Sequence, residues 1–209
     1  MKKAFSITEI ALGIFLICVI AAILFPLNII DRNQAHRIAL WKSFYPQLLY
    51  SFEMMQKDDA AFINAYKNDT TLSGTVFFDE FLKYMNKESD LKKKDYLKYK
   101  HKFFNGKIID RESKYRANKF VRLKNGMVIA FSETERTDDG ENPIGFLFVD
   151  VEGKYFCNLI GRDVFVVKMF ADRIEPFGYG LSIQDMKEDC SPVGSGLDCA
   201  AYYLLGGSF

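Results

Sequence analysis

The sequence of 209 residues has only two histidines and one tryptophan, and its 28 basic residues almost balance its 27 acidic ones. A chain with a net charge of +1 lacks the basic excess that is typical of nucleic-acid-binding domains. His36 and His101 are far apart, and neither is grouped with cysteines or carboxylates at the spacing of zinc ligands. We therefore expect neither a nucleic-acid partner nor a zinc site.

Motifs of the common enzyme classes are also lacking. The sequence has no G-x-S-x-G nucleophile motif, no H-E-x-x-H metal motif and no Walker phosphate-binding loop. Gly178-Tyr179-Gly180 lacks the third glycine of a dinucleotide-binding loop. Since 15% of the residues are aromatic, the chain is too rich in Phe and Tyr to be disordered. We expect a folded protein that is not an enzyme and needs no cofactor.

Charge is absent from one long segment near the N-terminus. From Ile10 to Ile30 there is no charged residue, and as a helix these 21 residues would reach roughly 31 Å. That length is about the thickness of the hydrocarbon core of a bilayer. Because Lys2 and Lys3 precede the segment, the positive-inside rule would keep the N-terminus in the cytoplasm and export the rest. The pattern predicts a transmembrane segment at about residues 10–30.

Three interpretations of this N-terminus compete. A secretory signal peptide would need a cleavage site of small residues, for which Val19-Ile20-Ala21 could serve, but further apolar residues follow it. A plain membrane anchor explains the length and orientation only. The third interpretation also uses Glu9, which otherwise completes an S-x-x-E helix-capping box with Ser6.

The opening residues MKKAFSITEI resemble the processing signal of type IV prepilins and type II secretion pseudopilins. That signal joins a short basic leader to a small residue, a Phe and, four residues later, a Glu in an apolar helix; here these are Ala4, Phe5 and Glu9. The resemblance implies that prepilin peptidase cleaves between Ala4 and Phe5 and that the new amine of Phe5 is methylated. Ala4 stands where glycine is usual. Pro26 lies 21 residues after Phe5, where many pilins carry a proline and where, as the resemblance implies, the helix loosens on assembly.

The resemblance implies a role in assembly. A glutamate in an apolar helix bundle needs a partner, and the Phe5 amine of a neighbouring subunit would pair with Glu9 and set the register. The chain would be a minor pilin or pseudopilin in the inner membrane, with its head outside the cytoplasm. Its partners would be other pilin-like subunits, prepilin peptidase and the inner-membrane assembly platform. The alternative is a single-pass, membrane-anchored extracytoplasmic binding domain.

Beyond the apolar segment, the hydrophobic pattern predicts how the head is built. Apolar residues recur at steps of three and four from Ile38 to Met55, which predicts that the N-terminal helix continues beyond residue 30 and packs on the head. This long helix is expected over residues 5–57, after a leader of residues 1–4. Pro46 should bend or restart it. A helical insertion is expected over residues 58–118, with short helices at 58–67 and 76–86. Within it, the lysine-rich residues 87–102 suit a solvated helix of mixed charge, which is the favoured interpretation, or a patch that binds DNA or an anionic surface.

The remaining residues, 119–209, predict a β-rich head. Two strands flank Asn125-Gly126, a strong hairpin signal, and further strands are expected within residues 145–156 and 163–170, with a last one at 200–205. Short turns between them predict an antiparallel meander. We therefore expect an α+β, pilin-like fold, in which a long N-terminal helix, half transmembrane, packs on an antiparallel sheet with extra short helices.

Two features of the head are candidate sites. Asp150, Glu152 and Asp163 partly match an oxygen-rich element of pilin-like heads that could hold Ca²⁺, but a hairpin turn with solvated carboxylates explains them too, and is the favoured interpretation. Cys190 and Cys199 bracket SPVGSGLD, which resembles the disulfide-bounded C-terminal loop of the pilin family. Such a bridge would contribute roughly 2–3 kcal/mol, and free thiols or a metal pair are the alternatives. Neither Cys18 nor Cys157 has an evident partner.

Overall fold

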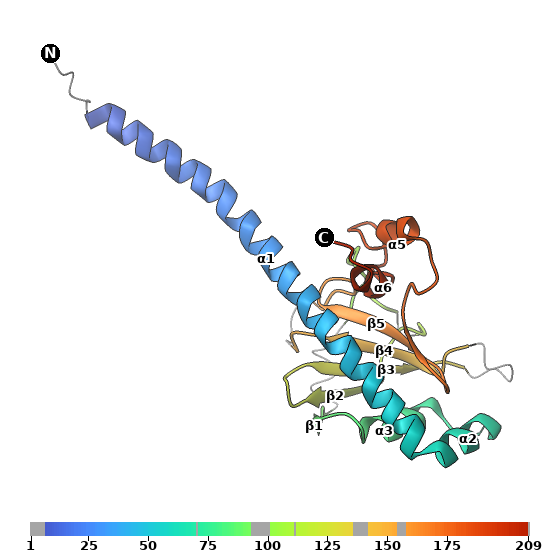
Figure 1. Cartoon of the computed structure of the whole chain (residues 1–209). Helices are drawn as coiled ribbons and strands as arrows, with labels where there is room; N and C mark the ends of the chain where they lie inside the picture. The colour runs from blue at the N-terminus through green and yellow to red at the C-terminus, as the bar shows by residue number, and fades with distance from the viewer. Residues whose placement is uncertain are drawn as a thin grey trace. The chain divides into compact units, whose positions relative to one another are not determined.

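The computed structural model describes residues 7–69, 71–92, 101–110, 112–135, 142–153 and 158–208, apart from the side chains of residues 9 and 21–32. The chain divides into two compact units, Met1–His36 and Arg37–Ser208. A single helix, α1 (Ile7–Asp58), contributes to both units and is 52 residues long. Figure 1 shows its course from the N-terminal end of the chain.

In the first unit, α1 exposes a run of apolar side chains. Between Ile10 and Ile20 the large hydrophobic residues are 42% to 68% exposed. They are Ile10, Leu12, Ile14, Phe15, Leu16, Ile17, Val19 and Ile20. Since successive residues of a helix are rotated by about 100°, these positions surround the whole helix instead of forming one stripe. Residues Ile10–Ile20 are called the apolar segment below.

The prediction that half of this helix is transmembrane is wrong. In the part of the chain that the structure describes, no helix combines the length and the apolar composition needed to cross a membrane. The apolar segment extends over eleven residues, or about 16 Å of helix, which is close to half of a hydrocarbon core.

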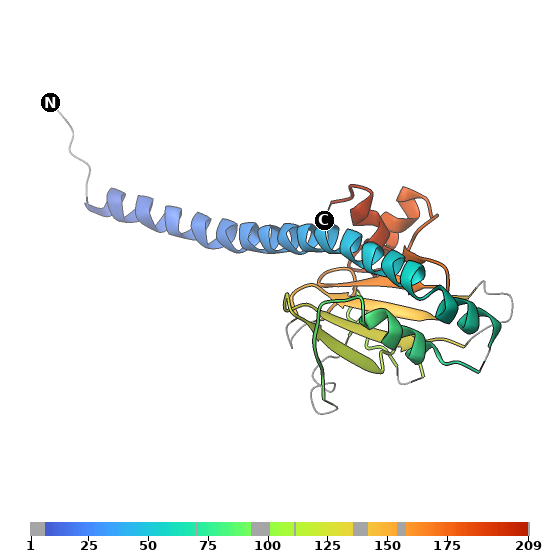
Figure 2. The ribbon, with the colours of Figure 1, turned by 60° about the horizontal axis from the view of Figure 1, so that its bottom comes forward.

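In the second unit, α1 lies along one face of a β-sheet, as Figures 1 and 2 both show. The predicted apolar stripe is confirmed, because its members at steps of three and four are all buried: Ile38, Trp41, Phe44, Leu48, Phe52 and Met55. Pro46 does not restart the helix, which continues through it to Asp58. Pro46 is exposed, so the carbonyl that its missing N–H leaves unpaired lies on the outer side of the helix, where water can bond to it.

Two short helices follow, as predicted. They are α2 (Ala60–Asn68) and α3 (Gly74–Leu82). Ser73 caps α3 by accepting the Val76 N–H, and Phe78 of α3 stacks on Phe131 of the sheet with ring centroids 4.7 Å apart. The helical insertion is therefore short, because residues 87–90 form a strand where a helix was one expectation.

Six antiparallel strands in the order of the sequence form the sheet of the described residues. They are β1 (Lys87–Asp90), β2 (Lys119–Leu123), β3 (Val128–Glu133), β4 (Gly145–Asp150), β5 (Val164–Met169) and β6 (Ile174–Pro176). The antiparallel meander and its Asn125-Gly126 hairpin are confirmed, with Val121 opposite Ile129. The two edge strands, β1 and β6, were not predicted, because they are short and carry little apolar pattern.

Both faces of the sheet are buried. Alternate residues of one face, such as Leu147 and Val167, join the α1, α2 and α3 side chains in a large hydrophobic cluster. The opposite residues, such as Phe146 and Val166, form a second cluster with Leu197 and Ile160. The central strands are therefore apolar at nearly every position.

The chain ends in two helices, α5 (Ile183–Asp189) and α6 (Cys199–Leu204). The predicted strand at 200–205 is wrong, since these residues are helical. The indole Nε1 of Trp41 donates a hydrogen bond of 3.0 Å to the carbonyl oxygen of Ala200. Five consecutive residues of α6, from Cys199 to Tyr203, are buried. A strand with one solvated face would instead alternate between buried and exposed residues.

Candidate functional site

The predicted processing and assembly residues are described only in part. Ala4 and Phe5 lie outside the described residues. Glu9 and Pro26 belong to α1, but their side chains are not described, so the Glu9 pairing and the role of Pro26 remain predictions. What the structure describes at this end of the chain is the apolar segment, with Cys18 exposed and not disulfide-bonded.

The predicted disulfide is confirmed. Cys190 follows α5 and Cys199 begins α6, and their sulfur atoms are bonded at 2.03 Å with Cα atoms 4.8 Å apart. Asp189 organises the loop between them, because its carboxylate accepts the Ser195 N–H at 2.7 Å and the Asp198 N–H at 3.0 Å. Burial, followed by repulsion from Asp189, raises the pKa of Asp198 to about 6. Cys157 lies outside the described residues.

The carboxylates considered for Ca²⁺ serve a turn. Asp150 ends β4, and its Oδ1 accepts the N–H groups of Glu152 and Gly153 at 3.0 and 2.8 Å. The Oε2 of Glu152 pairs with Nη2 of Arg37 on α1 at 3.2 Å, which turns this carboxylate toward a cation of the protein itself. Asp163 accepts the Leu159 N–H at 2.6 Å. Among the described residues, no group of three His, Cys, Asp or Glu side chains could hold a metal ion.

An open pocket of about 400 Å³ lies between the α2–α3 connection and the end of β3. Its walls include Tyr66, Thr71, Glu133 and Glu135. Glu133 already caps α3, because its carboxylate accepts the Gly74 N–H and, at 2.8 Å, the Thr75 hydroxyl. The Glu133 carboxylate is therefore committed to the fold. The sequence alone does not reveal this contact, because it joins residues almost sixty positions apart.

The basic segment of residues 87–102 is described at its two ends only. Lys87 to Asp90 form β1, where Lys87 pairs with Asp90 at 2.7 Å. His101 lies between the rings of Phe120 and Phe148, with centroids 5.9 and 5.2 Å away. Residues 93–100 lie outside the described residues, so the anionic-surface interpretation stays untested.

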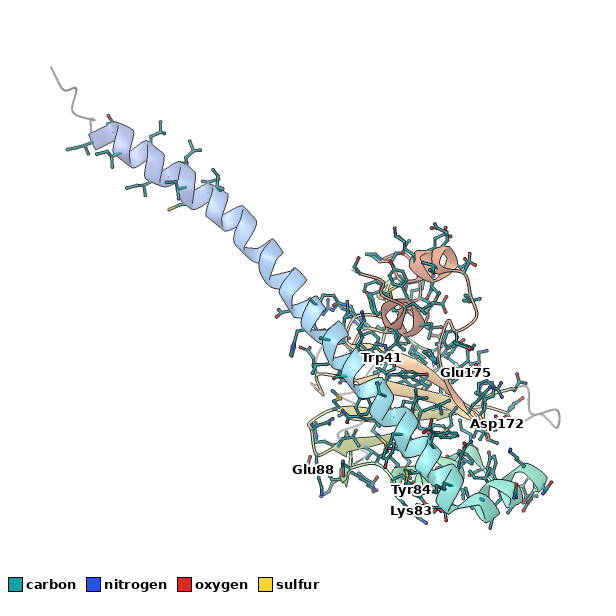
Figure 3. The ribbon with its side chains drawn as sticks, in the orientation of Figure 1. Trp41, Lys83, Tyr84, Glu88, Asp172 and Glu175 are labelled. Atoms are coloured by element: carbon teal, nitrogen blue, oxygen red, sulfur yellow. A yellow bond between two sulfur atoms is a disulfide. The ribbon has the colours of Figure 1, made fainter. Side chains whose placement is uncertain are left out.

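Figure 3 shows the side chains around α1, where Trp41 points from the helix toward the sheet. Trp41 is fully buried and stacks on Phe165 of β5 at 5.0 Å. The apolar side chains of the head are thus buried, and the candidate surface for function is the exposed apolar segment. Comparison with known protein families, with curated proteins and with solved structures gives no match to this chain.

Proposed function

We propose that this chain is a structural subunit, a minor pilin or pseudopilin, that assembles with other pilin-like subunits through its N-terminal helix. The observation that carries the proposal is the apolar segment. Its side chains are exposed on every side of α1, whereas the apolar residues of the head are packed in two clusters. A helix that is apolar all round is stable in water only when other helices surround it. Several copies in a bundle would provide that cover.

Two further features support this role. The opening residues MKKAFSITE resemble a prepilin signal, so the mature chain would begin at Phe5 after cleavage by prepilin peptidase. Glu9 would then meet the Phe5 amine of a neighbour and set the register of the bundle. The Cys190–Cys199 disulfide is of the kind that persists in oxidising compartments, which supports a head outside the cytoplasm.

The N-terminus of the protein purified from its natural host tests the processing step. Mass spectrometry of the full chain should find a mature N-terminus at Phe5 with a methylated amine. An intact Met1, or cleavage after residue 20, would contradict the proposal.

Cys18 tests the assembly step, because it is exposed within the apolar segment. A short thiol-reactive crosslinker should join Cys18 of neighbouring subunits in assembled material, and a Cys18→Ser variant should show no such product. Glu9→Ala should lower the yield of crosslinked product at least fivefold. The matched control is Glu53→Ala, since Glu53 is an exposed glutamate of the same helix. Equal yields for the two variants would disprove the role of Glu9.

A further inference from the structure

The connection between β4 and β5 buries two carboxyl groups that the assembly role does not use. Asp150 ends β4 and is 1% exposed, and Asp163 immediately precedes β5 and is 2% exposed. The register of the two strands places Asp150 opposite Val164, so both carboxyls lie at the same end of the sheet. Buried carboxyls need partners, because burial disfavours their charged form.

The two oxygens of Asp150 differ in their hydrogen bonds. Its Oδ1 accepts the two N–H groups of the turn, whereas its buried Oδ2 has no hydrogen-bond partner among the described residues. Asp163 holds the other end of the connection: its carboxylate accepts the Leu159 N–H, and its carbonyl oxygen accepts the Val151 N–H at 3.1 Å. The two carboxyls thus organise both ends of the chain segment from residue 150 to residue 163.

The same turn is tied to α1 and to the neighbouring hairpin. Glu152 pairs with Arg37, the first residue of the second unit. Arg122 of β2 donates hydrogen bonds to the carbonyl oxygens of Gly126 and Gly153 at 3.1 and 3.4 Å. A movement of the turn would therefore alter the ion pair of Arg37, which lies one helical turn before Trp41.

The charges that face these two carboxyls come from the turn, from α1 and from the β4–β5 connection. Asp163 and Glu152 repel a charge on Asp150, while Arg162 and Arg37 favour a charge on Asp163. Arg37 is shared, because it also pairs with Glu152. When both aspartates are ionised, Asp163 and Glu152 share the favourable charge of Arg37, and Asp150 is repelled by both of these carboxylates.

We propose that Asp150 and Asp163 form a proton-dependent latch, in which loss of their protons loosens the turn at residues 150–153, the Leu159 amide contact of Asp163 and the Glu152–Arg37 contact that ties the turn to α1. The electrostatic balance agrees with this. Burial, with repulsion from Asp163, raises the pKa of Asp150 to about 7. Burial raises the pKa of Asp163 to about 6 against the opposing hydrogen bonds and arginines. Both carboxyls therefore change charge between pH 5 and 8.

The sign of the effect follows from proton linkage. Each group has a folded pKa above its unfolded value of 3.8, so the folded state binds more protons than the unfolded state in this window. Stability should therefore fall as the pH rises from about 4 to 7, and should level off above that range. His101 has the opposite effect, because burial lowers its pKa: its contribution to stability rises as the pH increases from 4 to 6.5. The latch must be measured as a difference between variants that share His101.

Urea unfolding of the full chain, followed by Trp41 fluorescence in buffers with EDTA, provides the test. Asp150→Asn keeps an oxygen for the two turn N–H groups and carries no charge, so it imitates the protonated group. The ratio of the unfolding constant of the wild type to that of Asp150→Asn should increase at least tenfold from pH 5 to pH 8. Asp163→Asn should change the ratio in the same direction by a smaller factor. The matched control, Asp172→Asn, replaces an exposed aspartate and should leave the ratio constant.

A constant ratio for Asp150→Asn across this pH range would overturn the latch. If that variant does not fold, the wild type itself decides the question. Carbon-13 NMR of the aspartate carboxyls should then find Asp150 titrating between pH 6 and 8. Hydrogen exchange, corrected for intrinsic rates, should become faster at the amides of Val151, Gly153 and Leu159 over the same range. Titration of Asp150 below pH 5, or unchanged protection of these amides, would contradict the proposal.

Discussion

His101 is a polar residue inside an apolar cluster. Its ring contacts those of Phe120 and Phe148, and its buried Nε2 has no hydrogen-bond partner within the part of the chain that the structure describes. Burial lowers its pKa from 6.5 to about 4, because an imidazolium ion would lose its hydration there. The neutral ring therefore acts as a third aromatic ring in the second cluster, and its charged form opposes folding.

Replacement of His101 by Phe should change how stability responds to acid. In the wild type, the pKa of His101 is lower in the folded state than in the unfolded state. His101 therefore lowers the free energy of unfolding as the pH falls from 6.5 to about 4. The full decrease is about 3 kcal/mol. Chemical unfolding at pH 7 and pH 4.5 should show a smaller loss for His101→Phe than for the wild type. An identical loss would mean that His101 titrates normally.

At the scale of elements, two turns of the meander pack against each other. The β2–β3 turn contains Gly126 and the β4–β5 connection contains Gly153, and both glycines have positive φ angles of 87° and 60°. A Cβ atom on Gly126 would meet nothing within 4 Å, whereas one on Gly153 would lie 1.9 Å from the Gly126 carbonyl oxygen. The two glycines thus share a backbone constraint and differ in the space around them.

This difference predicts unequal costs for the same substitution. Gly126→Ala should destabilise the protein by about 1 kcal/mol, the usual cost of a left-handed conformation at alanine. Gly153→Ala should cost at least about 2 kcal/mol more, because the two turns must move apart. Urea denaturation of both variants measures the difference directly. Equal costs would show that the turns separate freely.

At the scale of the whole molecule, the core belongs to the second unit. Every buried residue of the two hydrophobic clusters lies at Ile38 or beyond, and the second unit begins at Arg37. The apolar segment of the first unit contributes exposed side chains only. The head should therefore be able to fold without the part of α1 that precedes it.

A chain that begins at Arg37 should show one cooperative thermal transition by circular dichroism, at nearly the midpoint of the full chain. A matched truncation that begins at Lys42 removes Ile38 and Trp41 as well. Loss of a buried tryptophan costs about 3–5 kcal/mol, so this second chain should melt roughly 10 °C lower or fail to fold. Equal thermal midpoints for the two truncated chains would show that Trp41 does not stabilise the packing of α1 on the sheet.

Local patterns were sufficient for much of the head. The buried stripe from Ile38 to Met55, the Asn125-Gly126 hairpin and the short helices α2 and α3 all follow from periodicity and turn residues. The Cys190–Cys199 bridge, suggested by resemblance to a known loop, is also present. Each of these features depends on residues that are close together in the sequence.

The errors arose where distant residues decide the structure. Residues 200–205 look like a strand, but most of them belong to α6, which accepts a hydrogen bond from Trp41 and packs Tyr203 against Phe165 of β5. The strand β1 is charged and joins the sheet by pairing with β2, which is distant in the sequence. The apolar run near the N-terminus suggested a membrane span, which the described helix does not provide.

By itself, the sequence determined α1 along the head, α2, α3 and the central strands, because apolar periodicity and turn residues act over a few positions. Only the tertiary structure decided the use of the charged groups. Glu133 caps α3, Glu152 pairs with Arg37, and one oxygen of Asp150 has no partner among the residues described. Electrostatic energies depend on burial and on the distance to groups remote in the chain, and folding alone sets both quantities.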